Sequence, residues 1–151
     1  MNADVFSDIT ETERAWIEAQ TALGYQLVSE YSPSDAHNQL CPQALDRAWT
    51  SWLAKDIDDA ECINQVINGI GTCFGILLVN TGVFEWTIAT DDFGTDLAVR
   101  ALPERGDVVV FPANFVSKRW ERKESAFLAD GYRSILKYVE NLKKEWDESG
   151  K

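Results

Sequence analysis

The feature that most constrains the fold is a change in the spacing of apolar residues between positions 78 and 84. Before this point apolar side chains recur every three or four residues, which is the spacing of one helix face. They are Ile63, Val66, Ile67, Ile70, Cys73, Phe74, Leu77 and Leu78. Gly71 and Gly75 lie on another face, where a missing side chain lets a strand or helix approach closely. We therefore expect a central helix here.

From residue 84 onwards the apolar residues alternate with others, which is the spacing of a half-buried strand. Phe84, Trp86 and Ile88 share one face of this expected strand. The turn sequences "DDFG" and "PERGD" are followed by two more strands, "TDLAVRAL" and "VVVF". Because short turns join antiparallel neighbours, the three strands are expected to form a meander.

Helices are expected on both sides of this unit. Thr10 and Glu13 form a capping box that starts a helix over residues 10–31. Its expected buried stripe is Trp16, Ala19, Leu23, Leu27 and Tyr31. Pro42 suits the first turn of a second helix. The apolar face of that helix carries Leu45, Trp49, Trp52 and Leu53.

The C-terminal part is expected to be a long helix that begins near Asn114, with a bend at Gly131 or at the preceding "RKES". Helices followed by a small sheet and another helix predict an α+β fold, with the last helix packed on the sheet. We expect a single domain over residues 1–151. It comprises an acidic helical part at 1–58 and a helix–sheet–helix core at 59–148.

The net charge of −11 is unevenly distributed. Residues 1–64 carry three basic against twelve acidic side chains, and residues 65–151 carry eleven against thirteen. An acidic chain repels a phosphate backbone, which argues against nucleic-acid binding. It favours capture of a basic protein partner. The expected partner-binding residues are Glu11, Glu13, Glu18, Asp56, Asp58, Asp59 and Glu61.

Cysteine usage and the N-terminal sequence predict a cytoplasmic protein. Cys41, Cys62 and Cys73 are an odd number without a C-x-x-C spacing. The start, "MNADVFSDITE", has neither the basic nor the apolar region of a signal peptide. The apolar run "VINGIGTCFGILLV" is too short to cross a bilayer, so no membrane interaction is expected.

Residues from about 60 to 136 resemble the domain-of-unknown-function family numbered 3806. The resemblance is carried by a glycine-bearing helix, a Trp-bearing strand, a D-x-x-G-T turn, and a proline followed by a Lys-Arg pair. The matching residues are Gly71, Gly75, Trp86, Asp91, Gly94, Thr95, Pro112, Lys118 and Arg119. The resemblance implies a fold that agrees with the spacing above. It implies no activity, because the family has no established one.

Two charge clusters have a structural and a functional interpretation. Asp91, Asp92 and Asp96 lie at the hairpin turn, with a spacing that does not fit a calcium loop, so turn formation is favoured over metal binding. The basic cluster, placed at the start of the last helix, is Lys118, Arg119, Arg122 and Lys123. We expect Arg119 to pair with a hairpin acid. The alternative is an anion site built from Lys118, Arg119 and the helix N-terminus.

No pattern of catalytic or metal-binding residues is present. His37 lies in a polar loop four residues before Cys41, where a Cys–His pair would need a shaped pocket and an orienting third group. We therefore expect no catalytic residue, no metal and no cofactor. Most of the six tryptophans are interpreted as core. An exposed Trp49 or Trp52 within the acidic surface would instead be a binding hot spot.

These observations favour a non-catalytic protein-binding module over an enzyme. Its size and charge are typical of bacterial immunity proteins that neutralise a toxin, including basic nucleases, by protein–protein contact; this is an analogy from charge and size. The alternative is a small-ligand-binding protein or enzyme that uses a cleft between the 84–101 hairpin and the last helix. Its polar groups would be Asp91, Asp96, Lys118 and Arg119.

Overall fold

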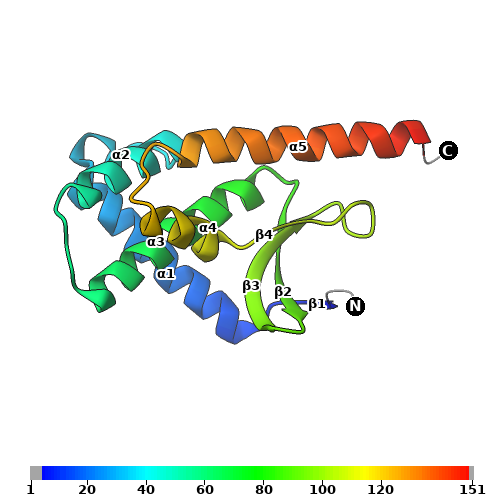
Figure 1. Cartoon of the computed structure of the whole chain (residues 1–151), viewed down its shortest axis with the longest axis horizontal. Coiled ribbons are helices and arrows are strands. Elements are labelled where there is room, and N and C mark those ends of the chain that lie inside the picture. Colours follow the sequence, from blue (N-terminus) through cyan, green and yellow to red (C-terminus); the bar gives the residue numbers. More distant parts are fainter. Residues whose placement is uncertain (1–4, 150–151) are drawn as a thin grey trace.

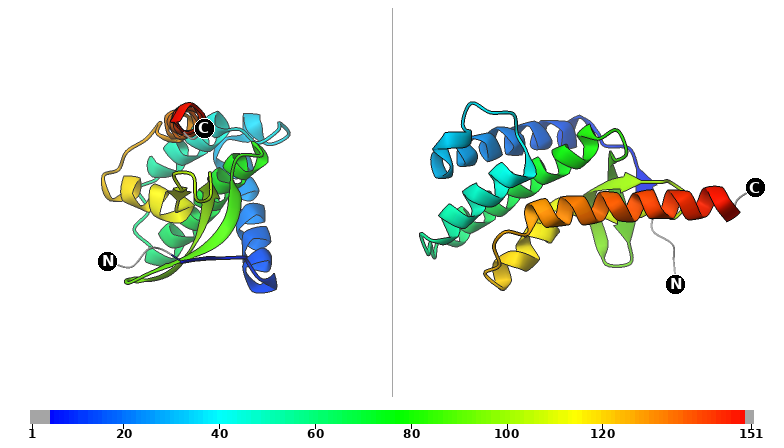
Figure 2. Two further views of the ribbon diagram at one scale, coloured as in Figure 1. Left: turned by 90° about the vertical axis from the view of Figure 1, so that its right-hand side faces the viewer. Right: turned by 90° about the horizontal axis from the view of Figure 1, so that it is seen from above.

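The computed structural model describes residues 5–149 and shows an α+β fold, in which helices pack around α3 beside a small sheet (Figure 1). The long helix α5 lies along one side and its outer turns extend past the sheet (Figures 1 and 2). The helices are α1 (Glu11–Tyr31), α2 (Pro42–Leu53), α3 (Ala60–Asn80), α4 (Pro112–Glu121) and α5 (Leu128–Ser149), with a 3₁₀ turn at Pro33–Asp35.

Helix α3 forms the centre of the core, as its spacing predicts. Asp59 caps it by accepting a hydrogen bond from the backbone N–H of Glu61 at 3.0 Å. Ile70, Cys73, Phe74 and Leu78 are almost completely buried. Among the described helices it is the one whose length and composition would suit a membrane span, but its apolar face packs inside the protein.

Glycines set the distance between α3 and its neighbours. A Cβ atom at Gly71 would lie 2.9 Å from the backbone of α4, and one at Gly75 would lie 2.6 Å from the Trp86 ring. The expected close approach is therefore confirmed for both a helix and a strand. The sequence interpretation missed a third such contact. Gly24 of α1 meets α3 so closely that its Cβ would lie 2.6 Å from the carbonyl oxygen of Gly69.

This contact explains why the buried stripe of α1 was predicted only in part: Leu27 is buried, and Leu23 and Tyr31 pack against the core, as expected. The capping box and the helix bounds are confirmed. However, Trp16 is 38% exposed and Ala19 is exposed, whereas the buried residues are Ile17, Gly24, Leu27 and Val28. A glycine adds nothing to an apolar pattern, so the pattern did not show that the face through Gly24 is the one that packs.

The sheet has four strands in the order β1-β2-β3-β4, all antiparallel. The strands are β1 (Val5–Ser7), β2 (Glu85–Asp91), β3 (Gly94–Ala101) and β4 (Val108–Val110). The meander β2-β3-β4 is confirmed, but the expected number of strands was wrong. Strand β1 pairs with β2 with Phe6 opposite Ala89, and the Thr87 hydroxyl donates to the Ser7 carbonyl at 3.0 Å. Three residues are too few to show an alternating pattern.

Helix α2 contributes two buried indoles. Trp49 and Trp52 are 0% and 2% exposed, and their ring centroids lie 5.3 Å apart. The idea that one of them is an exposed hot spot was therefore wrong, and their interpretation as core is confirmed. Trp49 Nε1 donates to the carbonyl of Glu124 at 2.8 Å, which ties α2 to the segment that follows α4.

The C-terminal part is two helices, because the chain leaves the helical conformation between residues 122 and 127. Lys123 and Ala126 have positive φ angles of 54° and 57° in this segment. The break thus falls at "RKES", and Gly131 lies within α5. Asp46 of α2 starts α5 by accepting hydrogen bonds from the N–H groups of Leu128 and Ala129 at 2.8 and 2.9 Å.

Helix α5 packs mainly on other helices, whereas we expected it to pack on the sheet. Its first turns contact α2 and α3. Its outer turns approach the sheet at the β3–β4 turn, where Arg105 pairs with Asp147 at 2.9 Å. The guanidinium of Arg105 also lies over the Trp146 ring, 5.7 Å from its centroid.

We predict that Gly24→Ala lowers the free energy of unfolding by about 2–3 kcal/mol, although alanine is the better helix former. The added Cβ would lie 2.3 Å from Cys73 Sγ and 2.6 Å from the backbone oxygen of Gly69, so the two helices must separate. Urea denaturation measures the change. Ser29→Ala, on an exposed face of the same helix, is the control and should change stability by less than about 0.5 kcal/mol. Equal effects of the two substitutions would contradict the close packing.

Candidate functional site

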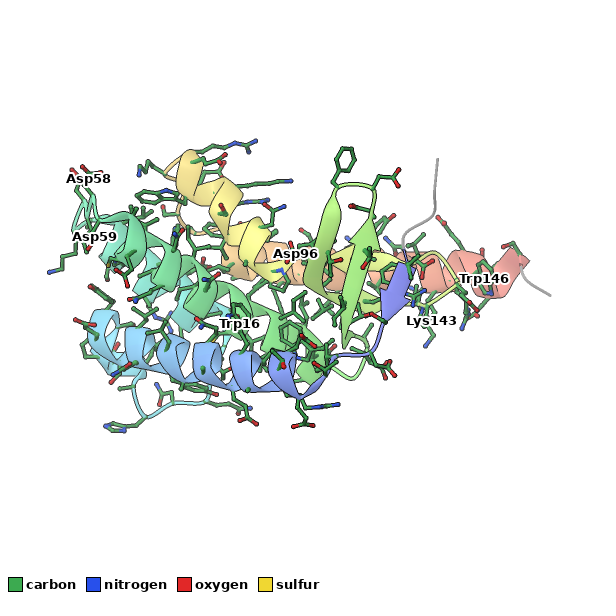
Figure 3. All side chains as sticks on the ribbon, turned by 90° about the horizontal axis from the view of Figure 1, so that it is seen from below. Trp16, Asp58, Asp59, Asp96, Lys143 and Trp146 are labelled. Carbon is green, nitrogen blue, oxygen red and sulfur yellow. The ribbon has the colours of Figure 1, made fainter. Side chains whose placement is uncertain are left out.

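The seven acids expected to bind a partner form two groups. Helices α1 and α3 run antiparallel, with Tyr31 near Cys62 and Thr21 near Cys73. Glu11 therefore lies about 20 Å from the Gly24 crossing in one direction, and Asp59 about 15 Å from it in the other. Figure 3 shows Asp58 and Asp59 at one end of the molecule and Trp16 far from them. One group is Glu11, Glu13 and Glu18; the other is Asp56, Asp58, Asp59 and Glu61.

The hairpin acids shape the turn between β2 and β3. Asp91 Oδ1 accepts a hydrogen bond from the N–H of Phe93 at 2.8 Å. Asp96 Oδ1 accepts one from the N–H of Leu97 at 2.9 Å, and the hydroxyls of Thr90 and Thr95 lie 3.0 Å apart. The turn-forming interpretation of Asp91 is thereby confirmed. Within residues 5–149, no group of three or more His, Cys, Asp or Glu side chains is placed to hold a metal ion.

The most exposed large apolar side chain in the described part of the chain lies at this turn. Phe93 is 98% exposed, between Asp92 and Gly94, and so projects from the end of the hairpin. We call residues 91–96 the hairpin end. The sequence analysis did not select Phe93. The available signal was its place in the two-residue turn between Asp91 and Gly94, because the tip of such a turn faces solvent.

The basic cluster lies at the opposite end of its helix from the one expected. Helix α4 begins at Pro112, so Lys118 and Arg119 occupy its last turn, where positive charge is favourable to the helix dipole. The electrostatic conflict that motivated an Arg119–hairpin pair does not exist. The anion site at a helix N-terminus is also excluded, because these side chains are not at that terminus. The cluster was assigned to the start of one long helix because only a bend was expected near residue 122. The chain instead breaks there, so that α4 ends at Glu121 and a separate helix, α5, begins at Leu128.

Arg119 is held by groups within its own segment. Its guanidinium lies over the Phe115 ring at 4.1 Å from the centroid, and Nη1 donates to the Phe115 carbonyl at 3.3 Å. Its ion pair is with Glu124, at 3.7 Å. Lys123 lies over the Trp120 ring. Two basic side chains of the cluster thus pack on aromatic rings at the α4–α5 connection, Arg119 on Phe115 and Lys123 on Trp120.

Two neighbouring cavities lie beside α4, one at the hairpin end and one at this basic cluster, and we call them together the hairpin groove. It comprises two cavities of about 280 and 250 Å³ that share Phe111 and Asn114. Asp91, Phe93 and Asp96 line the first cavity. Lys118, Arg119 and Ile135 line the second. The four polar residues named for a cleft therefore do border one groove, with acids at one end and bases at the other.

The carboxyl groups whose pKa is lowered, Glu13, Asp35 and Asp107, do not line this groove. Hydrogen bonds from Arg47, and next from Ser32, lower the pKa of Asp35 to about 2. The backbone N–H of Glu104, and next Arg100, lower the pKa of Asp107. These carboxylates brace loops, and no acid–base pair is assembled around them.

His37 and Cys41 do not form a reactive pair in a closed pocket. His37 is exposed in the loop after the 3₁₀ turn, and Cys41 is half-buried at the start of α2. Burial raises the pKa of Cys73 to about 12, so that thiol stays protonated at neutral pH. Neither cysteine meets the requirement for a nucleophile activated by a neighbouring base.

We predict that Arg119→Ala destabilises the protein by about 1 kcal/mol, because the substitution removes the stacking on Phe115. The melting temperature, followed by circular dichroism, should fall by about 2–4 °C. Lys118→Ala changes the charge equally at the exposed neighbouring position and should leave the melting temperature nearly unchanged. A fall of the same size in both variants would show that charge, and not the ring contact, is responsible.

Comparison with known proteins gives a family match for the central part of the chain. No curated protein and no solved structure matches it. A family model described as Domain of unknown function (DUF3806) matches residues 45–132, which extend from α2 to the first turns of α5. The match begins earlier than the resemblance from about residue 60, so it takes in most of α2 and the acids at 56–61. It includes all the lining residues of the hairpin groove except Ile135 and covers more than half of the chain, which therefore belongs to the DUF3806 family.

Proposed function

We propose that this protein is a non-catalytic binding module that uses the hairpin end and the first cavity of the hairpin groove to hold a basic protein partner. The observation that carries the proposal is the combination found there. Two exposed carboxylates, Asp91 and Asp96, and two phenylalanine rings, Phe93 and Phe111, border one cavity of about 280 Å³. Such a cavity suits a lysine or arginine side chain, whose aliphatic stem packs on the rings while its charge meets the carboxylates.

Hydrogen bonds within the hairpin end hold its carboxylates in place. Asp91 and Asp96 each use Oδ1 for a backbone N–H group. Both residues are exposed, so their carboxylates are accessible to a partner. The turn is thus held in place before binding, which reduces the entropy lost when a partner docks. An exposed aromatic anchor within an acidic surface has the composition of an interface hot spot.

The charge of the whole chain supports the same kind of partner. A net charge of −11 accelerates the encounter with a basic protein, and this steering weakens as salt shortens the Debye length. A basic toxin neutralised by a bacterial immunity-type protein fits this description, and we propose that class of partner. We also propose action in the cytoplasm, since Cys41, Cys62 and Cys73 are free thiols. The acids at residues 56–61 are a second candidate surface.

We predict that the wild-type protein, immobilised and exposed to lysate of its native host, retains a basic protein that is released at high salt. Phe93→Ala should weaken binding of that partner at least about tenfold, as expected for an aromatic hot spot. Asp96→Asn should weaken binding and reduce its salt dependence. Mass spectrometry identifies the partner, and calorimetry measures its affinity for each variant.

Asp58→Asn is the matched control, because it removes the same charge at the distant acidic end (Figure 3). It should leave the affinity nearly unchanged. Loss of binding in Asp58→Asn with full binding in Phe93→Ala would move the interface to residues 56–61. Partner binding that none of these substitutions affects, or a partner without net positive charge, would refute the proposed surface.

The second cavity of the hairpin groove favours an alternative, a small-ligand site or enzyme. Lys118 and Arg119 border it, and it joins the acidic cavity through Phe111 and Asn114. A ligand with a cationic and an anionic group would meet opposite charges at the two ends. Native mass spectrometry of protein purified from its host separates the two functions. A bound small molecule that Lys118→Ala removes and Phe93→Ala retains would favour the alternative.

A further inference from the structure

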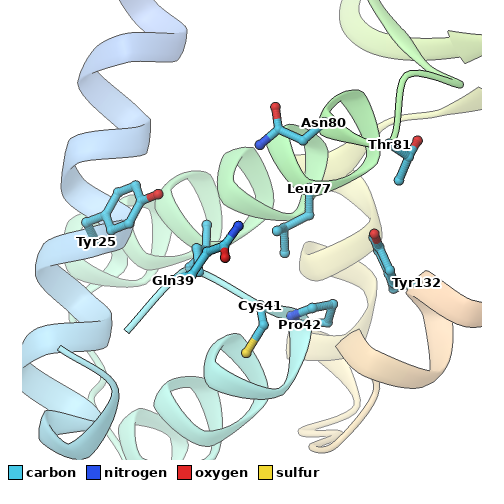
Figure 4. Close-up of a pocket in the computed structure, with 9 residues that line it drawn as sticks. Tyr25, Gln39, Cys41, Pro42, Leu77, Asn80, Thr81 and Tyr132 are labelled. Carbon is cyan, nitrogen blue, oxygen red and sulfur yellow. The ribbon is translucent and has the colours of Figure 1, made fainter. Parts of the chain in front are cut away.

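A further cavity lies away from the hairpin groove and shares no lining residue with it. It has a volume of about 460 Å³, within the range of small-molecule sites. It opens where the middle of α1, the loop at residues 39–41, the end of α3 and the start of α5 meet (Figure 4). Five segments thus contribute to one concave surface, counting the start of α2 at Pro42.

The chemistry of its lining is uncharged throughout. Leu77 and Pro42, both buried, supply an apolar floor. Tyr25 and Tyr132 stand on different sides, with the carboxamides of Gln39 and Asn80 between them (Figure 4). Charged residues make up 26% of the chain, yet none of them lines this cavity. The lining therefore favours uncharged ligands over ions. An ion entering it would lose hydration without gaining a counter-charge.

The wall that carries Gln39 is fixed by an ion pair. Asp35 accepts hydrogen bonds from Nε and Nη2 of Arg47, both at 2.8 Å, so the loop before the cavity is clamped to α2. Asp35 also accepts from the Ser32 hydroxyl at 2.5 Å. The start of this loop is thus tied to α2 by contacts that do not line the cavity.

We propose that this cavity binds a small uncharged ligand with a flat ring and an amide-type edge. The carboxamides of Gln39 and Asn80 each present one acceptor and one donor group, which match the donor and acceptor of an amide or lactam. The tyrosine side chains offer flat apolar faces and hydroxyl groups, and Leu77 packs against the ring. This site is independent of the hairpin end and of the partner proposed for it.

The alkylation rates of two cysteines can report whether a ligand occupies the cavity. Cys41 lines the cavity, whereas Cys62 lies in the first turn of α3, outside it, and both are half-buried. Cys73 is buried and does not compete for reagent. A ligand in the cavity should slow alkylation of Cys41 and leave the rate at Cys62 unchanged. Mass spectrometry of the labelled peptides reads both rates in one sample.

The experiment uses benzamide and benzoate as probes, because they share one ring and differ in charge. A ligand of about nine heavy atoms binds with a Kd in about the millimolar range. At a benzamide concentration several times that Kd, alkylation of Cys41 in the full-length protein should slow at least about threefold, with Cys62 unaffected. Benzoate should protect neither thiol. Equal protection by benzoate, equal slowing at Cys62, or no protection by benzamide would overturn the proposal.

A substitution that reverses the preference for charge tests the lining residues. Asn80→Asp adds one carboxylate to the cavity wall with little change in shape, so benzamide should lose its effect and the cation benzamidine should acquire it. Asn64→Asp, an exposed position on the same helix outside the cavity, is the control and should behave like wild type. Unchanged thermal melting shows that both variants fold. If Asn64→Asp produced the same switch, the cavity would not be the site.

Discussion

Close contact between backbones at α3 is the constraint on which the remaining structure depends. Gly24 of α1 lets that helix meet α3 at Gly69, and Gly71 lets the start of α4 meet it from another side. Beside these, Gly75 accepts the Trp86 ring of β2. Each contact exchanges a side chain for backbone proximity. The large rings of Trp49, Trp52 and Phe74 are buried in the same core.

This arrangement determines where the hairpin groove forms. Because Pro112 is held against Gly75, α4 must begin at α3 and leave the core with its basic end outermost. Strand β2 is held at the same glycine through Trp86, so the hairpin and α4 diverge from a common point. A groove between diverging elements widens away from the core. Asp91 and Asp96 of the hairpin end and the bases of α4 consequently border the same groove.

The spacing of apolar residues was sufficient to predict α3, the β2-β3-β4 meander and the α+β class. It failed where the packing depends on residues that carry no apolar signal. The stripe of α1 was misassigned because its contact face is centred on Gly24, and β1 was missed because three residues show no period. The basic cluster was assigned to a helix start, since the backbone break at Lys123 and Ala126 has no glycine or proline to mark it. Phe93 and the uncharged cavity depend on three-dimensional position, which local patterns do not encode.

The two candidate surfaces differ in the physical basis of recognition. At the hairpin end, the carboxylates of Asp91 and Asp96 are exposed, so their attraction for a partner is long-range and is screened by salt. In the cavity beside Leu77, the lining is neutral and recognition depends on the fit of a ring and on short hydrogen bonds. High salt should therefore release a partner from the first surface and leave an uncharged ligand in the second. One helix, α5, lines both sites, through Ile135 in the second cavity of the hairpin groove and through Tyr132 in the cavity beside Leu77.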